Sequence, residues 1–199
     1  MSFLAIYAEQ DASRPQLITT DGARIASELE AEGIRFERWT AGCELRDPTD
    51  QAQVLAAYAD DVARLKLENG FVTADVIGLT PDHPEREALR GKFLDEHRHA
   101  EHEVRFFVRG SGIFYLHLGE RVLAVGCEKD DLIAVPAGTA HWFDMGPTPD
   151  FTAIRLFTNP EGWVANFTDN DIAARFPRHE ALAEHFTQTA APHSQEESA

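Results

Sequence analysis

Two hydrophobic patterns divide the chain, and they change from one to the other after residue 92. In the first part, apolar residues recurring every three or four positions predict helices over 21–32, 50–68 and 82–91. Thr20 or Asp21 begins the first helix, Thr49 or Asp50 begins the second, and glycines follow both. Short apolar runs predict strands over 3–8, 34–39 and 71–79.

From 93 to 158 the chain consists of short apolar alternations separated by Gly, Pro and Asp. They predict strands over 104–108, 113–116, 121–125, 132–135 and 153–157. Many short strands at this spacing are typical of a sandwich or a barrel. Residues 163–185 predict one or two short helical turns, and the small polar residues 187–199 predict a disordered tail. No linker separates the helices from the strands, which favours one domain over 1–186.

The charge narrows the range of partners. Acidic residues number 34 against 18 basic ones, giving a net charge of −16 in 199 residues, so binding to nucleic acid or to an anionic membrane is disfavoured. No apolar run is long enough to cross a bilayer, and the first residues lack the features of a signal peptide. Cys43 and Cys127 predict reduced thiols rather than a disulfide framework. We therefore expect a soluble cytoplasmic protein, and the high charge favours a monomer.

Candidate metal ligands gather at the start of the second part. His97, His99 and His102 fall within six residues. On a strand, alternation places His97, His99, Glu103 and Arg105 on one face and His102 on the other. Two imidazoles and a carboxylate on one face can bind a divalent metal, and this donor set favours Fe, Ni or Mn over an ion that prefers thiolates.

A fourth ligand must come from elsewhere, and His141 is the candidate. It follows a hydrophobic strand and the turn Pro136–Gly138, which can present it to a neighbouring strand. Three histidines and one glutamate leave two positions of an octahedron open, which is typical of a catalytic metal rather than a structural one. The alternative is a surface pair or hydrogen-bonded core histidines. His117 is assigned to polar packing.

Arg105 follows Glu103 by two residues on the same predicted face. A guanidinium in that position can hydrogen-bond an anionic ligand as a fixed cation. The alternative is an ion pair with Glu101 or with another carboxylate of the barrel.

The segments around these histidines resemble two motifs of the cupin superfamily. Gly91, His97-x-His99, Glu103 and Gly110 are similar to the first motif, and Pro136-x-Gly138-x-x-His141 partly matches the second. Asp130 and Met145 depart from the second motif, at positions that do not hold the metal. The resemblance implies a mainly β chain with flanking helices, folded as a cupin double-stranded β-helix (jelly-roll) barrel. Its core would span about 91–160, after an elaboration over about 1–90.

A longer match, over roughly residues 1–180, resembles the acireductone dioxygenase family of methionine salvage. Its segments include 95–114, 135–144 and 154–163, and the run Glu103-Val104-Arg105-Phe106 is the most specific. The resemblance implies one Fe²⁺ or Ni²⁺ per chain, with acireductone (1,2-dihydroxy-3-keto-5-methylthiopentene) and O₂ as reactants. It further implies 4-methylthio-2-oxobutanoate and formate with iron, and 3-methylthiopropionate, formate and CO with nickel.

The same resemblance implies a pocket for a methylthio tail beside a catalytic, substrate-binding Arg105. Phe93, Phe143 and Trp163 are the candidates for its apolar wall, with ordinary core packing as the alternative. Other interpretations are another cupin oxygenase or isomerase, or a non-catalytic metal-binding module. A sugar phosphate is disfavoured because the chain has only three lysines, Lys66, Lys92 and Lys129. The sequence leaves the native metal open.

Overall fold

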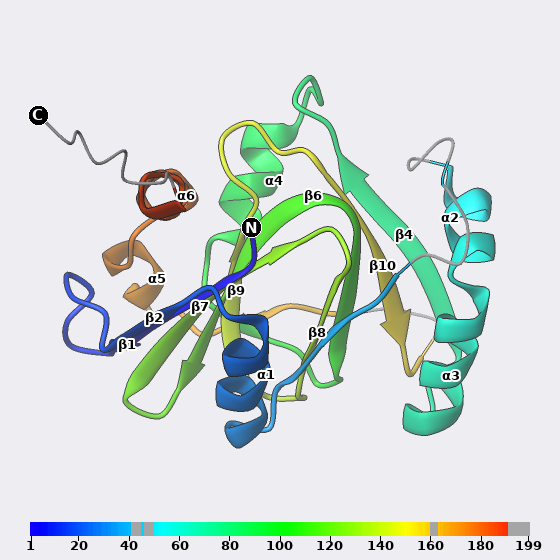
Figure 1. The fold of residues 1–199 in the computed structure, drawn as a ribbon, viewed down its shortest axis with the longest axis horizontal. Coiled ribbons are helices and arrows are strands. Elements are labelled where there is room, and N and C mark those ends of the chain that lie inside the picture. Colours follow the sequence, from blue (N-terminus) through cyan, green and yellow to red (C-terminus); the bar gives the residue numbers. More distant parts are fainter. Residues whose placement is uncertain (41–44, 46–49, 160–162, 191–199) are drawn as a thin grey trace, which may run out of the picture.

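The strands form two antiparallel layers that share one long strand (Figure 1). The computed structural model describes residues 1–40, 45, 50–159 and 163–190, and within these ranges eleven strands are connected by pairing. The strands of the first half are β1 (Phe3–Ala8), β2 (Leu17–Thr19), β3 (Arg35–Arg38), β4 (Thr73–Leu79) and β5 (His97–Arg98). Those of the second half are β6 (Glu103–Leu118), β7 (Arg121–Glu128), β8 (Asp131–Val135), β9 (Ala140–Asp144), β10 (Phe151–Phe157) and β11 (Asn166–Phe167).

The shared strand is β6, and its two halves belong to different layers. Residues 103–110 pair with β8 and β10, in a layer of order β4-β10-β6-β8-β3. Residues 111–118 pair with β7 and β9, in a layer of order β11-β5-β9-β6-β7-β1-β2. Two antiparallel layers joined in this way are the double-stranded barrel that the sequence predicts.

A glycine allows β6 to pass between the layers without ending. Gly110 has φ +68°, and a Cβ atom there would overlap the backbone carbonyl of Asp150. A side chain at this position would be both strained and obstructed. The sequence predicts separate strands over 104–108 and 113–116. This prediction is wrong, because both segments belong to β6, which continues through Gly110.

Alternation along the strands fills the barrel interior and its two outer faces. In β1, Leu4 and Ile6 belong to the interior core, whereas Phe3 and Tyr7 belong to a second core under the C-terminal helices. In the first half of β6, Phe107 is interior and Phe106 lies in a third core. Every layer is therefore covered by apolar side chains on both faces.

Helices cover the two outer faces, as Figure 1 shows at its left and right sides. The helices are α1 (Gly22–Ala31), α2 (Gln51–Ala57), α3 (Ala59–Asn69), α4 (Arg86–Phe93), α5 (Ile172–Arg175) and α6 (His179–Ala190). The ring of Phe186 on α6 stacks on Phe3 at 4.0 Å between centroids. Tyr58, between α2 and α3, meets Phe106 edge-on at 4.7 Å.

The single helix predicted over 50–68 is wrong, because it is two helices. Asp50 caps α2 by accepting a hydrogen bond from the backbone N–H of Gln53, as expected. The chain leaves helical geometry at Tyr58, with φ −115° and ψ 23°, where the ring is buried against β6. The apolar period continues across this break, so the pattern alone does not reveal it.

Other element boundaries also differ from the sequence predictions. α4 begins at Arg86 rather than near Pro84. α6 has 12 residues and extends to Ala190, so 187–190 are helical where a disordered tail is predicted, and 191–199 lie outside the described residues. Cys127 is a buried free thiol, whereas Cys43 lies outside the described part of the chain. Among the described residues, no helix is long and apolar enough to cross a bilayer.

Candidate metal centre

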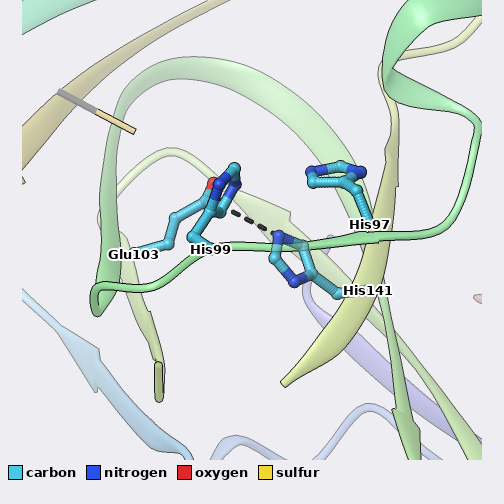
Figure 2. Close-up of side chains that lie close together, drawn as sticks. All are labelled: His97, His99, Glu103 and His141. Carbon is cyan, nitrogen blue, oxygen red and sulfur yellow. Dashed lines mark hydrogen bonds and ion pairs between the residues drawn. The ribbon is translucent and has the colours of Figure 1, made fainter. Parts of the chain in front are cut away.

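The four predicted ligands come together from separate parts of the fold (Figure 2). One ligand atom from each of His97, His99, Glu103 and His141 lies within 4.8 Å of the others, and all four residues are buried. His97 on β5 stands directly opposite His141 on β9. Glu103 is the first residue of β6, and His99 follows β5 by one residue.

The prediction that these residues share the face of one continuous strand is wrong for its first half. β5 ends at Arg98, and the chain turns before β6 begins at Glu103. The turn follows from a tertiary contact, because the carbonyl of His99 accepts a hydrogen bond from Gly138 at 2.9 Å. Gly138 has φ +79°, and its turn reverses the chain into β9 so that His141 faces His97. From Glu103 onward the predicted alternation is correct.

Backbone carbonyls orient all three imidazoles. Nδ1 of His97 lies 2.8 Å from the carbonyl of Asp95. Nδ1 of His99 lies 2.9 Å from the carbonyl of Val164, and Nδ1 of His141 lies 2.8 Å from that of Thr139. A carbonyl only accepts, so each Nδ1 carries the proton and each Nε2 keeps a lone pair. This arrangement leaves three Nε2 atoms free to bind a metal ion.

The contacts of Glu103 indicate that a cation belongs among these atoms. Its Oε2 lies 3.0 Å from Nε2 of His99 and 3.0 Å from Nε2 of His141. A carboxylate and two unprotonated nitrogens are all acceptors, so a proton or a metal ion must lie between them. Three imidazoles and one carboxylate are a donor set that a divalent Fe or Ni ion accepts, and the residues therefore fit the expected metal.

The charges of His97 and Glu103 also suit metal binding. Burial, with the neighbouring His141, lowers the pKa of His97 to about 4, so its imidazole is neutral at pH 7. Burial disfavours the charge of Glu103, but Arg105 and the two histidines outweigh burial and hold its pKa well below the usual range. Burial opposes the charge of His99, yet its hydrogen bond to Glu103 raises its pKa. A metal ion therefore meets a preformed carboxylate anion.

A cavity of about 230 Å³ adjoins the four ligands. Arg105 is buried in its wall, with Nε 2.7 Å from Oε1 of Glu103, and its guanidinium carbon lies 4.7 Å from the ring centroid of Phe143. The ring centroids of Phe93 and Trp163 lie 5.9 and 5.8 Å from the same guanidinium carbon. All four predicted pocket residues thus line one cavity with the ligands. The carboxylate partner of Arg105 is Glu103 rather than Glu101, which accepts hydrogen bonds from Thr158 and Asn159.

The cavity wall includes residues that the sequence reasoning did not select. Arg155 stands opposite Arg105 in the pairing of β10 with β6, and its Nε and Nη2 lie 2.8 and 2.6 Å from the carboxylate of Asp75. The sequence signal that could have indicated Arg155 is its position as a lone arginine within the apolar run 153–157. The remaining wall residues are Lys92, Ala165 and Phe167.

Two other histidines lie outside the centre, as the sequence indicates. His102 is exposed on the opposite side of the β6 start, next to a small cavity lined by Leu65 and Val104. His117 is hydrogen-bonded to Glu96 and is not part of the ligand cluster. A larger cavity, of about 400 Å³, lies between α6 and the β6–β7 pair and contains none of the four ligands.

A jelly-roll barrel that gathers three imidazoles and a carboxylate beside an apolar cavity defines a metal-binding cupin. The family model of the ARD/ARD′ family matches residues 4–165. The chain belongs to this family.

Named relatives agree with this assignment. An acireductone dioxygenase from Hahella chejuensis is 59% identical over 184 residues, which cover 92% of this chain and 99% of the relative. One from Marinobacter nauticus is 57% identical over 183 residues, covering 92% and 98%. Among solved structures, the acireductone dioxygenase from Bacillus anthracis with a cadmium ion in its active centre is 28% identical, with a TM-score of 0.72, covering 84% of this chain and 98% of that one. The expected cupin fold is confirmed.

Proposed function

We propose that this chain is an acireductone dioxygenase, which cleaves 1,2-dihydroxy-3-keto-5-methylthiopentene with O₂ in methionine salvage. The observation that carries the proposal is the buried cluster of three histidines and Glu103, with a buried arginine in the wall of the same cavity. The identities of 59% and 57% to named acireductone dioxygenases, over nearly their whole length, support the choice of substrate.

His97, His99, Glu103 and His141 are proposed to hold one Fe²⁺ or Ni²⁺ per chain. A bound divalent ion supplies Lewis acidity, which stabilises the negative charge of the deprotonated enediol. The proposed products are 4-methylthio-2-oxobutanoate and formate for the iron-loaded protein. For the nickel-loaded protein they are 3-methylthiopropionate, formate and CO.

Arg105 is proposed to bind and orient the enediolate. Its Nη1 is buried and has no hydrogen-bond partner among the described residues. A buried donor without a partner is costly, and an anionic oxygen of the substrate would satisfy it. Because a guanidinium stays protonated at any working pH, this donor also supplies a positive charge next to the enediolate.

Phe93, Phe143 and Trp163 are proposed to hold the methylthio tail and to exclude water. Trp163 is fixed in place by the hydrogen bond that its Nε1 donates to the carbonyl of His102 at 3.1 Å. Its ring stacks on His99 with 5.9 Å between centroids. The indole therefore covers one ligand while it forms part of the cavity wall.

We also propose that residues 1–186 act as one soluble cytoplasmic domain, as a monomer without nucleic-acid or membrane partners. The net charge of −16 supports the proposed absence of nucleic-acid and membrane partners, since it opposes contact with polyanions. The ligands of the domain are then a small molecule and O₂.

Anaerobic loading followed by O₂ tests the proposed activity. Metal-free protein is loaded with Fe²⁺ or Ni²⁺ and mixed with acireductone without O₂, and the enediol absorbance is followed before and after O₂ is admitted. We expect loss of absorbance only after O₂, formate from both forms, and CO from the nickel form alone. Binding of the substrate without O₂-dependent loss would overturn the proposal.

A matched pair of histidine variants controls this experiment. His99→Ala removes a proposed ligand and is expected to abolish metal retention and turnover. His102→Ala removes an exposed imidazole only three residues away and is expected to leave both unchanged. Full metal retention by His99→Ala would show that the ligand set is wrong.

A further inference from the structure

Glu96 is a buried carboxylate next to the ligand His97, and the proposed chemistry does not use it. Its side chain is only 2% exposed. Nδ1 of His117 lies 2.6 Å from its Oε1, and the hydroxyl of Thr168 donates to its Oε2 at 2.5 Å. Each carboxylate oxygen therefore has a hydrogen-bond partner from a different part of the chain.

These contacts join the beginning of β5 to two other strands. His117 lies on β6, where it stands opposite Ala140, the neighbour of His141 on β9. Thr168 directly follows β11, and its backbone N–H donates to the carbonyl of Glu96 at 3.1 Å. Glu96, the residue just before His97, is thus connected to β6 and to the end of β11.

Strand pairing holds β5 at only a few positions. It has two residues, and its pairing with β9 consists of the one pair His97–His141. Its other neighbour, β11, also has two residues, and both are exposed. So short a strand contributes few backbone hydrogen bonds, and side-chain contacts add to the restraint on His97.

The Glu96–His117 contact is suited to that role. A carboxylate hydrogen-bonded to an imidazole makes a stronger contact than a neutral hydrogen bond, and leaving the buried carboxylate of Glu96 without this partner is costly. Alternation on β6 places His117 with Tyr115, on the side of the strand opposite Leu116 and the barrel interior. The pair therefore lies behind the ligands, where it touches neither metal nor substrate.

We propose that Glu96 and His117 are a positioning pair that fixes β5, so that His97 and His99 converge with Glu103 and His141 on one metal ion. The proposal rests on the metal site of the proposed function. His117 is in turn restrained on its far side, where Nε2 lies 3.8 Å from the carboxylate of Glu9 just after β1. The pair acts on metal binding through the backbone of β5.

Two amide substitutions of His117 separate positioning from a general loss of packing. In His117→Asn the amide nitrogen lies close to the place of Nδ1 and can donate to Glu96. In His117→Gln it lies near the place of Nε2 and points away from Glu96. Both variants are polar and similar in size, so a role in packing alone affects them alike.

The affinity of the metal-free protein for Ni²⁺, measured by competition with a chelator, is the readout. Loss of a hydrogen-bond partner of a metal ligand weakens binding by about 10–100-fold, and this pair acts one step further from the metal, through the backbone of β5, so we take the lower part of that range, about tenfold. We expect that loss of affinity in His117→Gln and in Glu96→Ala, and no further loss when these two substitutions are combined. His117→Asn is expected to keep near wild-type affinity. X-ray absorption of the nickel-loaded variants is expected to show weaker histidine scattering where affinity is lost.

Arg98→Gln is the control, because Arg98 is an exposed residue of β5 itself. It is expected to keep wild-type affinity. Equal Ni²⁺ affinities and equal scattering in His117→Asn and His117→Gln would overturn the proposal. Since no acireductone is present, a protein that binds Ni²⁺ as expected but lacks dioxygenase activity would contradict the proposed function and leave the positioning pair intact.

Discussion

At the scale of single residues, the centre depends on backbone carbonyls as much as on its ligands. The carbonyls of Asp95, Thr139 and Val164 each accept the Nδ1 proton of one imidazole. These partners fix the tautomer, so that Nε2 is the free nitrogen in all three histidines. The backbone conformation of three loops therefore determines which nitrogen binds the metal.

Arg105→Met tests the proposed contact between the guanidinium and the enediolate. Methionine keeps the length and the apolar contacts of the side chain but removes its donors and charge. A hydrogen bond to a charged group contributes about 1.5–3 kcal/mol, so kcat/KM, expressed per bound metal ion, is expected to fall by roughly 10–150-fold.

The control for this variant lies on the same strand. Arg109 pairs with the half-exposed Asp150 and is not part of the cavity wall. Arg109→Met is therefore expected to keep kcat/KM within about twofold, in line with the small contribution of surface ion pairs. An Arg105→Met enzyme as efficient as the wild type would refute the substrate contact.

Gly112→Ala tests whether Phe143 shapes the pocket. An added Cβ at Gly112 would overlap the ring of Phe143, which packs against Arg105. The ring has to move, and we expect KM to rise while the affinity for Ni²⁺ is unchanged. Gly22→Ala is the control, because a Cβ there meets nothing within 4 Å. An unaltered KM in Gly112→Ala would exclude a tail pocket bounded by Phe143.

Spacing in the sequence was enough to pick out the four residues of the cluster but not the contacts that support them. The HxH pair with Glu103 four residues later, and His141 after its turn, marked all four. By contrast, Val164 lies 65 positions from His99, and Glu96 lies 21 from His117. Contacts over such distances depend on strand pairing, which a local pattern of residue types does not contain.

At the scale of elements, several strands of six or more residues and the capped starts of α1 and α2 could be predicted, whereas the full length of β6 and the shortest strands could not. β1, β4 and β7 each have at least six residues and match predicted runs closely. β5 and β11 have two residues each, too few to show an alternation. They form because neighbouring strands present free backbone groups, a tertiary effect.

One side chain connects three elements and makes the stability of the fold depend on pH. Asp144 on β9 is buried and accepts hydrogen bonds from Arg90 on α4 at 2.8 and 3.0 Å, and from the backbone N–H of His179 on α6 at 3.0 Å. Burial disfavours its charge, but these partners outweigh burial and lower its pKa. The ionised form of Asp144 therefore stabilises the folded state.

The sign of the pH dependence follows from that direction. A carboxyl group with a lowered folded pKa stabilises the protein fully above its unfolded pKa of about 4, and this contribution is lost as pH falls through the folded value. Asp144→Asn is expected to lower the free energy of unfolding by about 1–3 kcal/mol at pH 7, and the difference from wild type should shrink below pH ~4. Urea unfolding at several pH values measures both.

The half-exposed Asp150 supplies the control for Asp144. Its ion pair with Arg109 lies at the surface, so Asp150→Asn is expected to change the free energy of unfolding by less than about 1 kcal/mol. If Asp144→Asn differed from wild type by the same amount at pH 3 and pH 7, the assigned role of its ionised form would be wrong.

At the scale of the whole molecule, charge is divided between exterior and interior. The chain carries −16, yet Arg105 and Arg155 line the cavity beside the single liganding carboxylate, Glu103. The total charge could be read from the sequence, as could a barrel of short strands. The location of the two arginines at one cavity required the pairing of β6 with β10.

This division predicts opposite effects of salt on two ligands of the same site. At low ionic strength the field of the −16 surface extends tens of ångströms, attracting a divalent cation and repelling an anionic enediolate. Salt screens that distant field before it screens the contacts inside the cavity. Raising NaCl from 10 to 150 mM should therefore slow Ni²⁺ uptake by the metal-free protein and speed enediolate binding to the loaded protein, each by roughly two- to tenfold. Stopped-flow measurement of both association rates tests this, and slopes of the same sign would show that the surface charge does not govern access to the centre.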